Sequence, residues 1–273
     1  ESEAAVEVAL VEDEMHNRTI IRVCTEALVN GAAEGVTGAL DGSTIDTTKL
    51  SEALSTAEAL GCVTEEATLL VTTSRLVRRI RRALVSQDFQ ALEAALAEAS
   101  GVTVSDLVAH EIRVAQDELD SRVLLMELSS ALSHGMASGG PGRMNTGTVE
   151  TDPLIDGLAL AQRLGVKTPE ARQMLFTAKV VLRLRQTLLG GDYDEAHLTL
   201  EAVRGKTLSA VAMHEIRAVQ DEVDNWMITT ECSRAIEAGR ASGDVGELDT
   251  SVISVAALRK ALHHAEELGC KTA

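Results

Sequence analysis

One acidic phrase occurs three times in this chain, and its spacing determines how the rest of the sequence is interpreted. It reads VAHEIRVAQDELDSR at 108–122, AMHEIRAVQDEVDNW at 212–226 and, more faintly, AVEVALVEDEMHNR at 5–18. Glu7, Glu111 and Glu215 align at intervals of 104 residues without any insertion or deletion. The two complete copies are identical at 30 of 104 positions, which is too many for chance at a fixed offset. The sequence therefore predicts a repeated unit of 104 residues.

The repeat divides the chain into a first helical unit over 1–104, a second over 105–208 and a partial third over 209–273. By this alignment residue 1 falls inside the first helix of a unit and residue 273 at the start of a third helix. Complete arrays usually carry atypical polar units at their ends, and none is evident here. We therefore expect a segment of a longer array.

Each unit is expected to contain about four helices. In the second copy these cover about 105–133, 153–164, 169–190 and 193–204. Thr168, Pro169 and Glu170 form a typical helix start, with a capping hydroxyl, a proline at the first position and a carboxylate at the positive dipole end. Asp192 is the expected cap of the short fourth helix. The pattern predicts an all-α fold of tandem helical repeats, arranged as an elongated α-solenoid or a spectrin-like rod.

Composition supports helices and excludes several classes of partner. Apolar residues make up 45% of the chain and aromatic residues only 1%, which suits closely packed Ala- and Leu-rich helices. The net charge of −17 repels nucleic-acid phosphates and anionic lipids. No apolar run approaches the roughly 20 residues of a membrane span. We therefore expect no nucleic-acid or membrane partner and a cytoplasmic location, with the cytoskeleton as one candidate.

The cysteines are interpreted as small apolar residues. Cys24 and Cys232 occupy equivalent positions, and the middle copy has Leu128 there. A disulfide or a metal ligand would not tolerate that exchange, whereas a packed core would. No cofactor is expected.

The period of 104 residues and the helical content resemble those of spectrin-type repeats, which also join units through long continuous helices. The resemblance covers the period and the helicity only. Spectrin repeats use three helices of similar length, and they have no glycine-rich loop like the one described below. The resemblance implies a rod-like array and assigns no site residues.

The acidic phrase and the third helix together predict interhelical ion pairs. Carboxylates at positions equivalent to Glu111, Asp117 and Glu118 recur in all three copies, and Arg79 and Arg81 recur in the second copy. Retained carboxylates and retained guanidiniums indicate pairs that set the packing register. The ion-pair candidates are Glu7, Asp13, Glu14, Glu111, Asp117, Glu118, Glu215, Asp221, Glu222, Arg79, Arg81, Arg183 and Arg185.

Other interpretations of these residues stay open or fail on spacing. Clustered carboxylates can bind Ca²⁺ or assist acid–base chemistry. A helical zinc motif needs a second His four residues after His110, where the chain has Val114. The basic stretch at 75–84 is typical of a calmodulin-target helix, but the second copy dilutes it. No zinc site and no enzymatic site are predicted.

A glycine pattern, G-x-A-x-G-x-x-G, follows the long helix in every copy. Its members are Gly31, Gly35, Gly38, Gly135, Gly139, Gly142, Gly239, Gly243 and Gly246. A glycine-rich turn can cradle phosphate through backbone amides, but the known motifs lie between a strand and a helix. We expect a structural turn that ends the helix and, because it recurs on the surface, can touch a neighbouring chain.

These features favour a non-enzymatic scaffold that spaces or binds partners, or associates with itself, in a large intracellular assembly, cytoskeletal or filament-associated. The alternative is an adaptor or regulatory arm that binds a partner peptide or helix. A Ca²⁺-responsive element is a third, weaker hypothesis.

Overall fold

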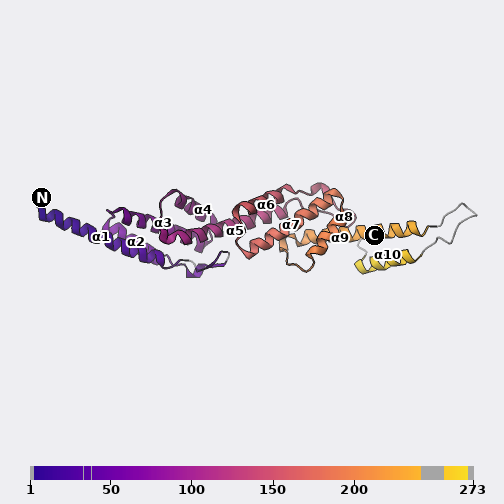
Figure 1. Ribbon diagram of the computed structural model, residues 1–273, viewed down its shortest axis with the longest axis horizontal. Coiled ribbons are helices and arrows are strands. Elements are labelled where there is room, and N and C mark those ends of the chain that lie inside the picture. The colour runs from indigo at the N-terminus through magenta and orange to yellow at the C-terminus, as the bar shows by residue number, and fades with distance from the viewer. Residues whose placement is uncertain (1–2, 33, 38, 241–254, 270–273) are drawn as a thin grey trace, which may run out of the picture. The chain divides into compact units, whose positions relative to one another are not determined.

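The structure is a computed structural model that describes residues 3–32, 34–37, 39–240 and 255–269 (Figure 1). The prediction of an all-α fold is confirmed, since most of the described residues lie in helices. The helices are α1 (Glu3–Val29), α2 (Thr48–Leu60), α3 (Glu65–Ser86), α4 (Phe89–Gly101), α5 (Ala109–Ser133), α6 (Asp152–Leu164), α7 (Pro169–Gly190), α8 (Tyr193–Val203), α9 (Met213–Ala238) and α10 (Val255–Leu268). None of them is long and apolar enough to cross a membrane.

Side-chain caps mark the starts of α3, α4 and α8. The Thr64 hydroxyl accepts a hydrogen bond from the Ala67 N–H at the start of α3. Asp88 and Asp192 do the same at the starts of α4 and α8, where they accept from the N–H groups of Ala91 and Glu195. Such side chains satisfy backbone donors that have no partner within the helix. The expected cap at Asp192 is confirmed.

The helices have matching bounds along the chain. Helices α2 and α6 both have 13 residues, and α3 and α7 both have 22, with starts 104 positions apart in each pair. Short 3₁₀ turns over Asp106–Val108 and Ala210–Ala212, also 104 apart, lead into α5 and α9.

The chain divides into two compact units. Unit 1 comprises residues 1–123 and 167–169, and unit 2 comprises 124–166 and 170–273. Helix α5 therefore contributes its first part to unit 1 and its second part to unit 2.

The core of unit 1 consists of two apolar clusters. The first joins α1, α2 and α3 through residues such as Cys24, Leu54 and Val71. The second joins α3, α4 and the first part of α5 through Ile80, Leu92 and Leu119. Helix α3 belongs to both clusters, so it is the central helix of this unit.

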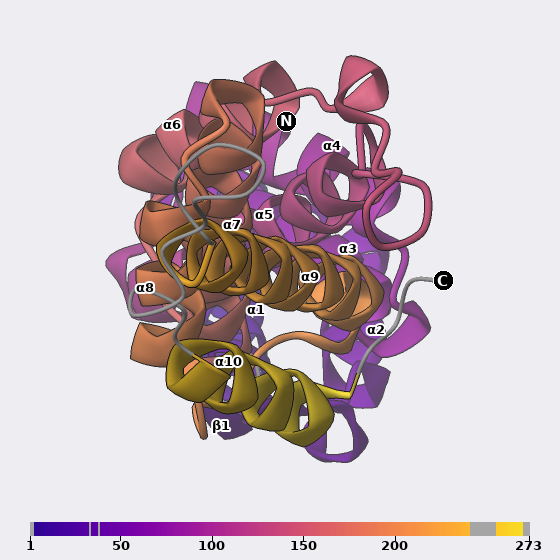
Figure 2. The ribbon, with the colours of Figure 1, turned by 90° about the vertical axis from the view of Figure 1, so that its right-hand side faces the viewer.

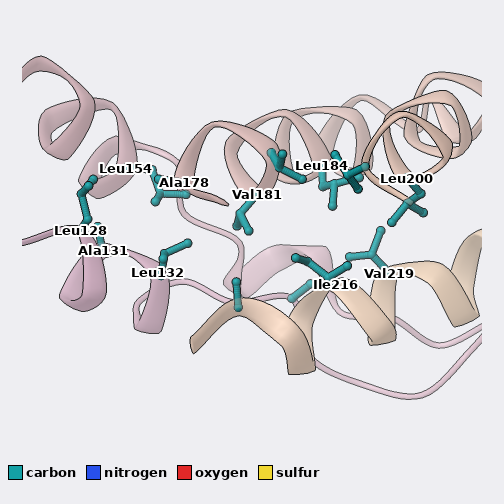
Figure 3. Close-up of a cluster of buried hydrophobic side chains, with 14 of the residues drawn as sticks. Leu128, Ala131, Leu132, Leu154, Ala178, Val181, Leu184, Leu200, Ile216 and Val219 are labelled. Atoms are coloured by element: carbon teal, nitrogen blue, oxygen red, sulfur yellow. The ribbon is translucent and has the colours of Figure 1, made fainter. Parts of the chain in front are cut away.

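The core of unit 2 is one continuous cluster. Figure 3 shows Leu128 and Leu132 of α5 beside Leu154 of α6, with side chains of α7 and α8 above the first half of α9. Leu184 of α7 and Val219 of α9 belong to the same cluster. Farther along the chain, α10 packs beside the second half of α9 (Figure 2).

The loops after α1 and α5 each contain a short hairpin that the glycine pattern did not predict. In unit 1, β1 (Glu34–Val36) pairs antiparallel with β2 (Ala39–Asp41), with Glu34 opposite Asp41. In unit 2, Ser138 pairs with Asn145 in a single antiparallel bridge. These pairs are 104 positions apart, so both loops have the same register.

Candidate functional site: buried arginine junctions

Two arginines of the third helices lie fully buried, each at the meeting point of four chain segments. Arg81 of α3 and Arg185 of α7 both have 0% exposed side chains. A buried guanidinium is unfavourable unless its donors are satisfied. We call each arginine and the groups it binds an arginine junction.

In the Arg81 junction the guanidinium forms a two-point contact with the carboxylate of Glu111 on α5. Arg81 Nε lies 2.7 Å from Glu111 Oε1, and Nη2 lies 2.9 Å from Oε2. Nη2 also donates to the Leu28 carbonyl at 2.9 Å, and Nη1 donates to the Asn30 carbonyl at 2.7 Å. The arginine therefore caps the carboxyl end of α1, where the helix dipole favours a cation, and holds α5 through its carboxylate.

The Arg185 junction repeats this arrangement in unit 2. Arg185 Nε and Nη2 lie 2.8 Å and 2.9 Å from the two carboxylate oxygens of Glu215 on α9. Nη2 also donates to the Leu132 carbonyl at 3.0 Å, and Nη1 donates to the Glu150 carbonyl at 2.8 Å. Arg185, Glu215 and Leu132 each lie 104 positions after Arg81, Glu111 and Leu28.

A second contact, which the sequence analysis did not identify, connects the same helices. The buried hydroxyl oxygens of Thr73 on α3 and Thr177 on α7 accept hydrogen bonds from the N–H groups of Ser105 and Ser209, at 3.0 Å and 2.9 Å. Both serines precede a long helix. The signal was present in the sequence, because an identical threonine stands on the apolar face of the third helix in both copies.

The glycine-rich loop of unit 2 is attached to α9 by its backbone. The N–H of Ala137 donates to Glu215 at 3.2 Å, and the N–H of Gly142 donates to the buried Glu222. Glu215 and Glu222 are seven residues apart, so both face the loop from one side of α9. The acidic phrase of α9 therefore binds the preceding glycine loop as well as the preceding arginine.

The first glycine of the loops after α1 and α5 has a conformation that other residues avoid. Gly31 and Gly135 have φ angles of +73° and +60°. A Cβ atom on Gly31 would lie 2.6 Å from the Asp46 carbonyl oxygen, and one on Gly135 would lie 2.3 Å from the Glu150 Cβ. The same two pairs of residues close the loops through backbone hydrogen bonds of 3.2 Å and 3.1 Å.

The remaining loop glycines differ from one another in backbone conformation and position. Gly139 and Gly142 have positive φ angles, Gly35 lies in β1, and Gly239 ends α9 with a φ of −94°. Gly38, Gly243 and Gly246 lie outside the described residues. The expected turn thus has a specific form in unit 2, a helix end followed by the bridged hairpin.

Arg79 and Arg183 differ from the expectation that they would pair with the acidic phrase. Arg79 pairs with Glu98 of α4, and Arg183 pairs with Glu195 of α8. All four side chains are substantially exposed to solvent. Residues two apart on a helix point about 200° apart, so Arg79 and Arg81 cannot face the same neighbour. Glu98 and Glu195 also do not occupy equivalent positions. Both contacts are therefore interpreted as surface ion pairs that contribute little to stability.

The other acidic candidates have individual surroundings. Asp117 pairs with Lys167, and Glu14 pairs with Arg18 one turn away on α1. The Asp13 carbonyl accepts a hydrogen bond from Asn17, and Glu7 lies on the exposed first part of α1. Glu118 and Asp221 also have interactions. Within the described residues, no group of three or more His, Cys, Asp or Glu side chains is arranged to hold a metal ion.

In the part of the chain that the structure describes, three groups have a pKa that departs from the usual value. Burial raises the pKa of the Cys24 thiol, which lies in the α1–α2–α3 cluster. Burial also raises the pKa of Tyr193, and the nearby Glu222 carboxylate adds to the effect. The N–H of Thr48 holds the pKa of the exposed Asp46 carboxyl below its usual value.

A cavity of about 390 Å³ adjoins the glycine-rich loop of unit 2. Backbone of residues 135–139 and the side chains of Thr148, His214 and Ala218 line it. The Thr148 and Ser138 hydroxyls are already bonded to each other at 3.3 Å. The cavity is thus an open surface feature with few groups directed at a ligand.

No protein-family model, no curated protein and no solved structure matches the chain. The geometry of the junctions is therefore the basis on which a role is assigned.

Proposed function

We propose that the chain is a non-enzymatic structural segment of tandem helical repeats that maintains an even spacing within a large intracellular assembly, such as a cytoskeletal filament. The observation that carries the proposal is the repetition of the arginine junction. Arg81 and Arg185 bind the equivalent carboxylates of Glu111 and Glu215 and the equivalent helix-end carbonyls of Leu28 and Leu132, each pair 104 positions apart.

The physical argument concerns geometry rather than stability. A buried ion pair gains little net free energy, because desolvation offsets much of the attraction. A two-point contact between planar groups does, however, restrict the orientation of the helices that carry them. Each junction fixes the next long helix against the end of the previous one, and the threonine contact fixes its start. The proposed role is that this restriction, repeated after 104 residues, contributes to an even spacing.

The glycine loop is the proposed contact surface for partners of the assembly. Met136, Ser138, Gly139 and Gly140 are exposed in unit 2, and the loop is attached to α9 through Glu215 and Glu222. In unit 2 the loop is therefore both exposed and held against α9, as a contact surface requires. Such loops are common sites of protein contact.

Crosslinking mass spectrometry on native extracts would test this proposal. We expect crosslinks from matching positions of successive units, 104 residues apart, to a repeating partner or to other copies of the chain. Crosslinks confined to one unit and one partner would contradict a spacing role.

That second outcome would support the alternative, an adaptor arm that binds a partner helix. One observation favours it independently. Part of the apolar surface of α9 and α10 is exposed in the described structure, with Ile236 and Leu262 at 60% and 50%.

A further inference from the structure

The second half of α9 and helix α10 form a two-helix layer with an exposed apolar face. We call this the α9–α10 face, and it consists of Ile228, Cys232, Ile236, Leu258 and Leu262. Ile236 and Leu262 are its most exposed members. Ala261 and Ala265 of α10 are buried between the two helices, so the layer itself is well packed.

Equivalent faces earlier in the chain are buried under a third helix. Ile236 corresponds to Leu28 and Leu132, whose exposed fractions are 3% and 0%. Leu28 belongs to a cluster that contains Leu70 and Val71 of α3. Leu132 belongs to one that contains Ala178 and Val181 of α7. The two earlier layers thus show what kind of element covers such a face.

We propose that the α9–α10 face is a docking surface for a single amphipathic helix of the α3 and α7 type. Its length would match the 22 residues of both helices. It would carry small and aliphatic residues three and four positions apart and an arginine near its carboxyl end, as Arg81 and Arg185 do. The inference rests on the tandem repeat proposed above.

Charge and continuity favour this occupant over others. Arg81 and Arg185 donate to the carbonyls of Leu28 and Leu132, near the ends of α1 and α5. The corresponding carbonyl belongs to Ile236, near the end of α9, where the dipole again favours a cation. The face also continues along α9 from Ile216, Val219 and Val223, which are already buried against α7 and α8. A helix with an apolar stripe and a terminal arginine satisfies both features.

The test uses the whole chain and a peptide with the sequence of α7, residues 169–190, labelled with a fluorophore. Fluorescence anisotropy should show saturable binding. The variant Ile236→Asn should weaken binding at least about tenfold, because a large apolar contact becomes polar. Val181→Asn in the peptide should have the same effect. Both changes are uncharged, so they leave the attraction between a basic peptide and an acidic protein unaltered.

The matched control is Ile155→Asn on α6. Ile155 is also exposed, at 45%, and does not belong to the α9–α10 face. Binding to this variant should stay within about twofold of the unaltered chain. The bound peptide should also protect the Cys232 thiol from alkylation while leaving Cys62 reactive, and circular dichroism should show that each variant is folded.

Absence of saturable binding, or equal losses from Ile236→Asn and Ile155→Asn, would overturn the proposal. Light scattering would then show whether a second copy of the chain covers the face. A monomer whose Cys232 is already protected without peptide would indicate another segment of the same chain. Neither result bears on crosslinks at the glycine loops, so failure of this inference is separable from failure of the scaffold proposal.

Discussion

Each arginine junction depends on contacts between a few atoms. Its contribution to the free energy of unfolding can be measured by removing one partner at a time. Arg185→Met would leave the Glu215 carboxylate buried, with only 2% of its side chain exposed. We expect a loss of about 3–5 kcal/mol in the free energy of unfolding, the usual cost of an uncompensated buried charge. Urea denaturation followed by fluorescence of Trp226, the single tryptophan, would measure it.

Two further variants make this prediction specific. Arg183→Met removes a largely exposed arginine two residues away and should cost less than about 1 kcal/mol. The double variant Arg185→Met with Glu215→Met should regain a large part of the loss, because no buried charge remains. Equal losses from Arg183→Met and Arg185→Met would show that burial does not distinguish the two arginines.

Gly135 is a second residue whose replacement has a predictable cost, because of its backbone conformation and its close neighbour. Gly135→Ala would introduce a Cβ only 2.3 Å from the Glu150 Cβ at a φ of +60°. We expect a loss of at least about 1–2 kcal/mol, from the left-handed conformation together with the steric conflict. Gly190→Ala, where a Cβ would meet nothing within 4 Å, should be neutral or slightly stabilising. Thermal unfolding of both variants gives the comparison.

The alkylation rate of the Cys24 thiol measures how readily the core of unit 1 opens. Burial raises its pKa above the ordinary value of 9.0, so it should react with iodoacetamide at least about tenfold more slowly than Cys62 at pH 8.5. The sign for stability follows from linkage. Because the folded pKa is the higher one, the thiol contributes fully below its ordinary pKa and less as the pH rises through the folded pKa. Comparable alkylation rates would show that the α1–α2–α3 cluster opens readily.

At the scale of the helix, described residues of the acidic phrase form ion pairs and hydrogen bonds, and we expect no bound cation to be needed for their packing. Asp117 and Lys167 form a partly exposed pair, so Asp117→Asn should cost less than about 1 kcal/mol. We expect 5 mM CaCl₂ to leave the melting temperature of the chain and of this variant unchanged within about 1 °C. A rise on Ca²⁺ addition that Asp117→Asn abolishes would instead support a Ca²⁺-responsive element.

Many of the helix boundaries could be predicted from the sequence. Helix starts depend on local residues such as Asp192 and Pro169, and local residues can be read directly. The pairing of Arg79 with Glu98 was less accessible, because the partner lies on another helix and has no equivalent in the second copy. The hairpin in the loop depends on backbone pairing such as Ser138 with Asn145, for which glycine spacing gives no signal.

The junctions themselves were only half predictable. Recurrence placed Arg81 and Glu111 among the ion-pair candidates, since both residues return in the second copy, but it did not select them as partners of each other. It could not identify the carbonyls of Leu28 and Leu132, because every residue has a carbonyl and sequence does not show which ones lose their helical partner. For the same reason, the sequence could not show that the backbone N–H of Ala137 donates a hydrogen bond to Glu215. Side-chain identities are repeated in the sequence, whereas backbone contacts become evident only in the fold.

At the scale of the whole molecule, each unit has its own core and its own junction, and this arrangement predicts how the chain unfolds. The clusters around Arg81 contain only unit 1 residues, and the cluster around Arg185 contains only unit 2 residues. In a chain with separate cores, stability is approximately a sum of unit terms and neighbour terms if the proposed repeat architecture holds. Weakening one junction should therefore lower the stability of its own unit more than that of the other.

Arg81→Met is the variant that tests this separation. Trp226 stacks on Tyr193 at 5.4 Å within unit 2, so its fluorescence reports on unit 2 alone, whereas far-ultraviolet circular dichroism reports on all helices. In Arg81→Met we expect an early circular dichroism phase at lower urea, with a Trp226 midpoint close to that of the unaltered chain. Arg185→Met should lower the Trp226 midpoint instead. If both probes shift together in both variants, the units unfold as one cooperative body, and the shared helix α5 rather than the separate cores governs stability.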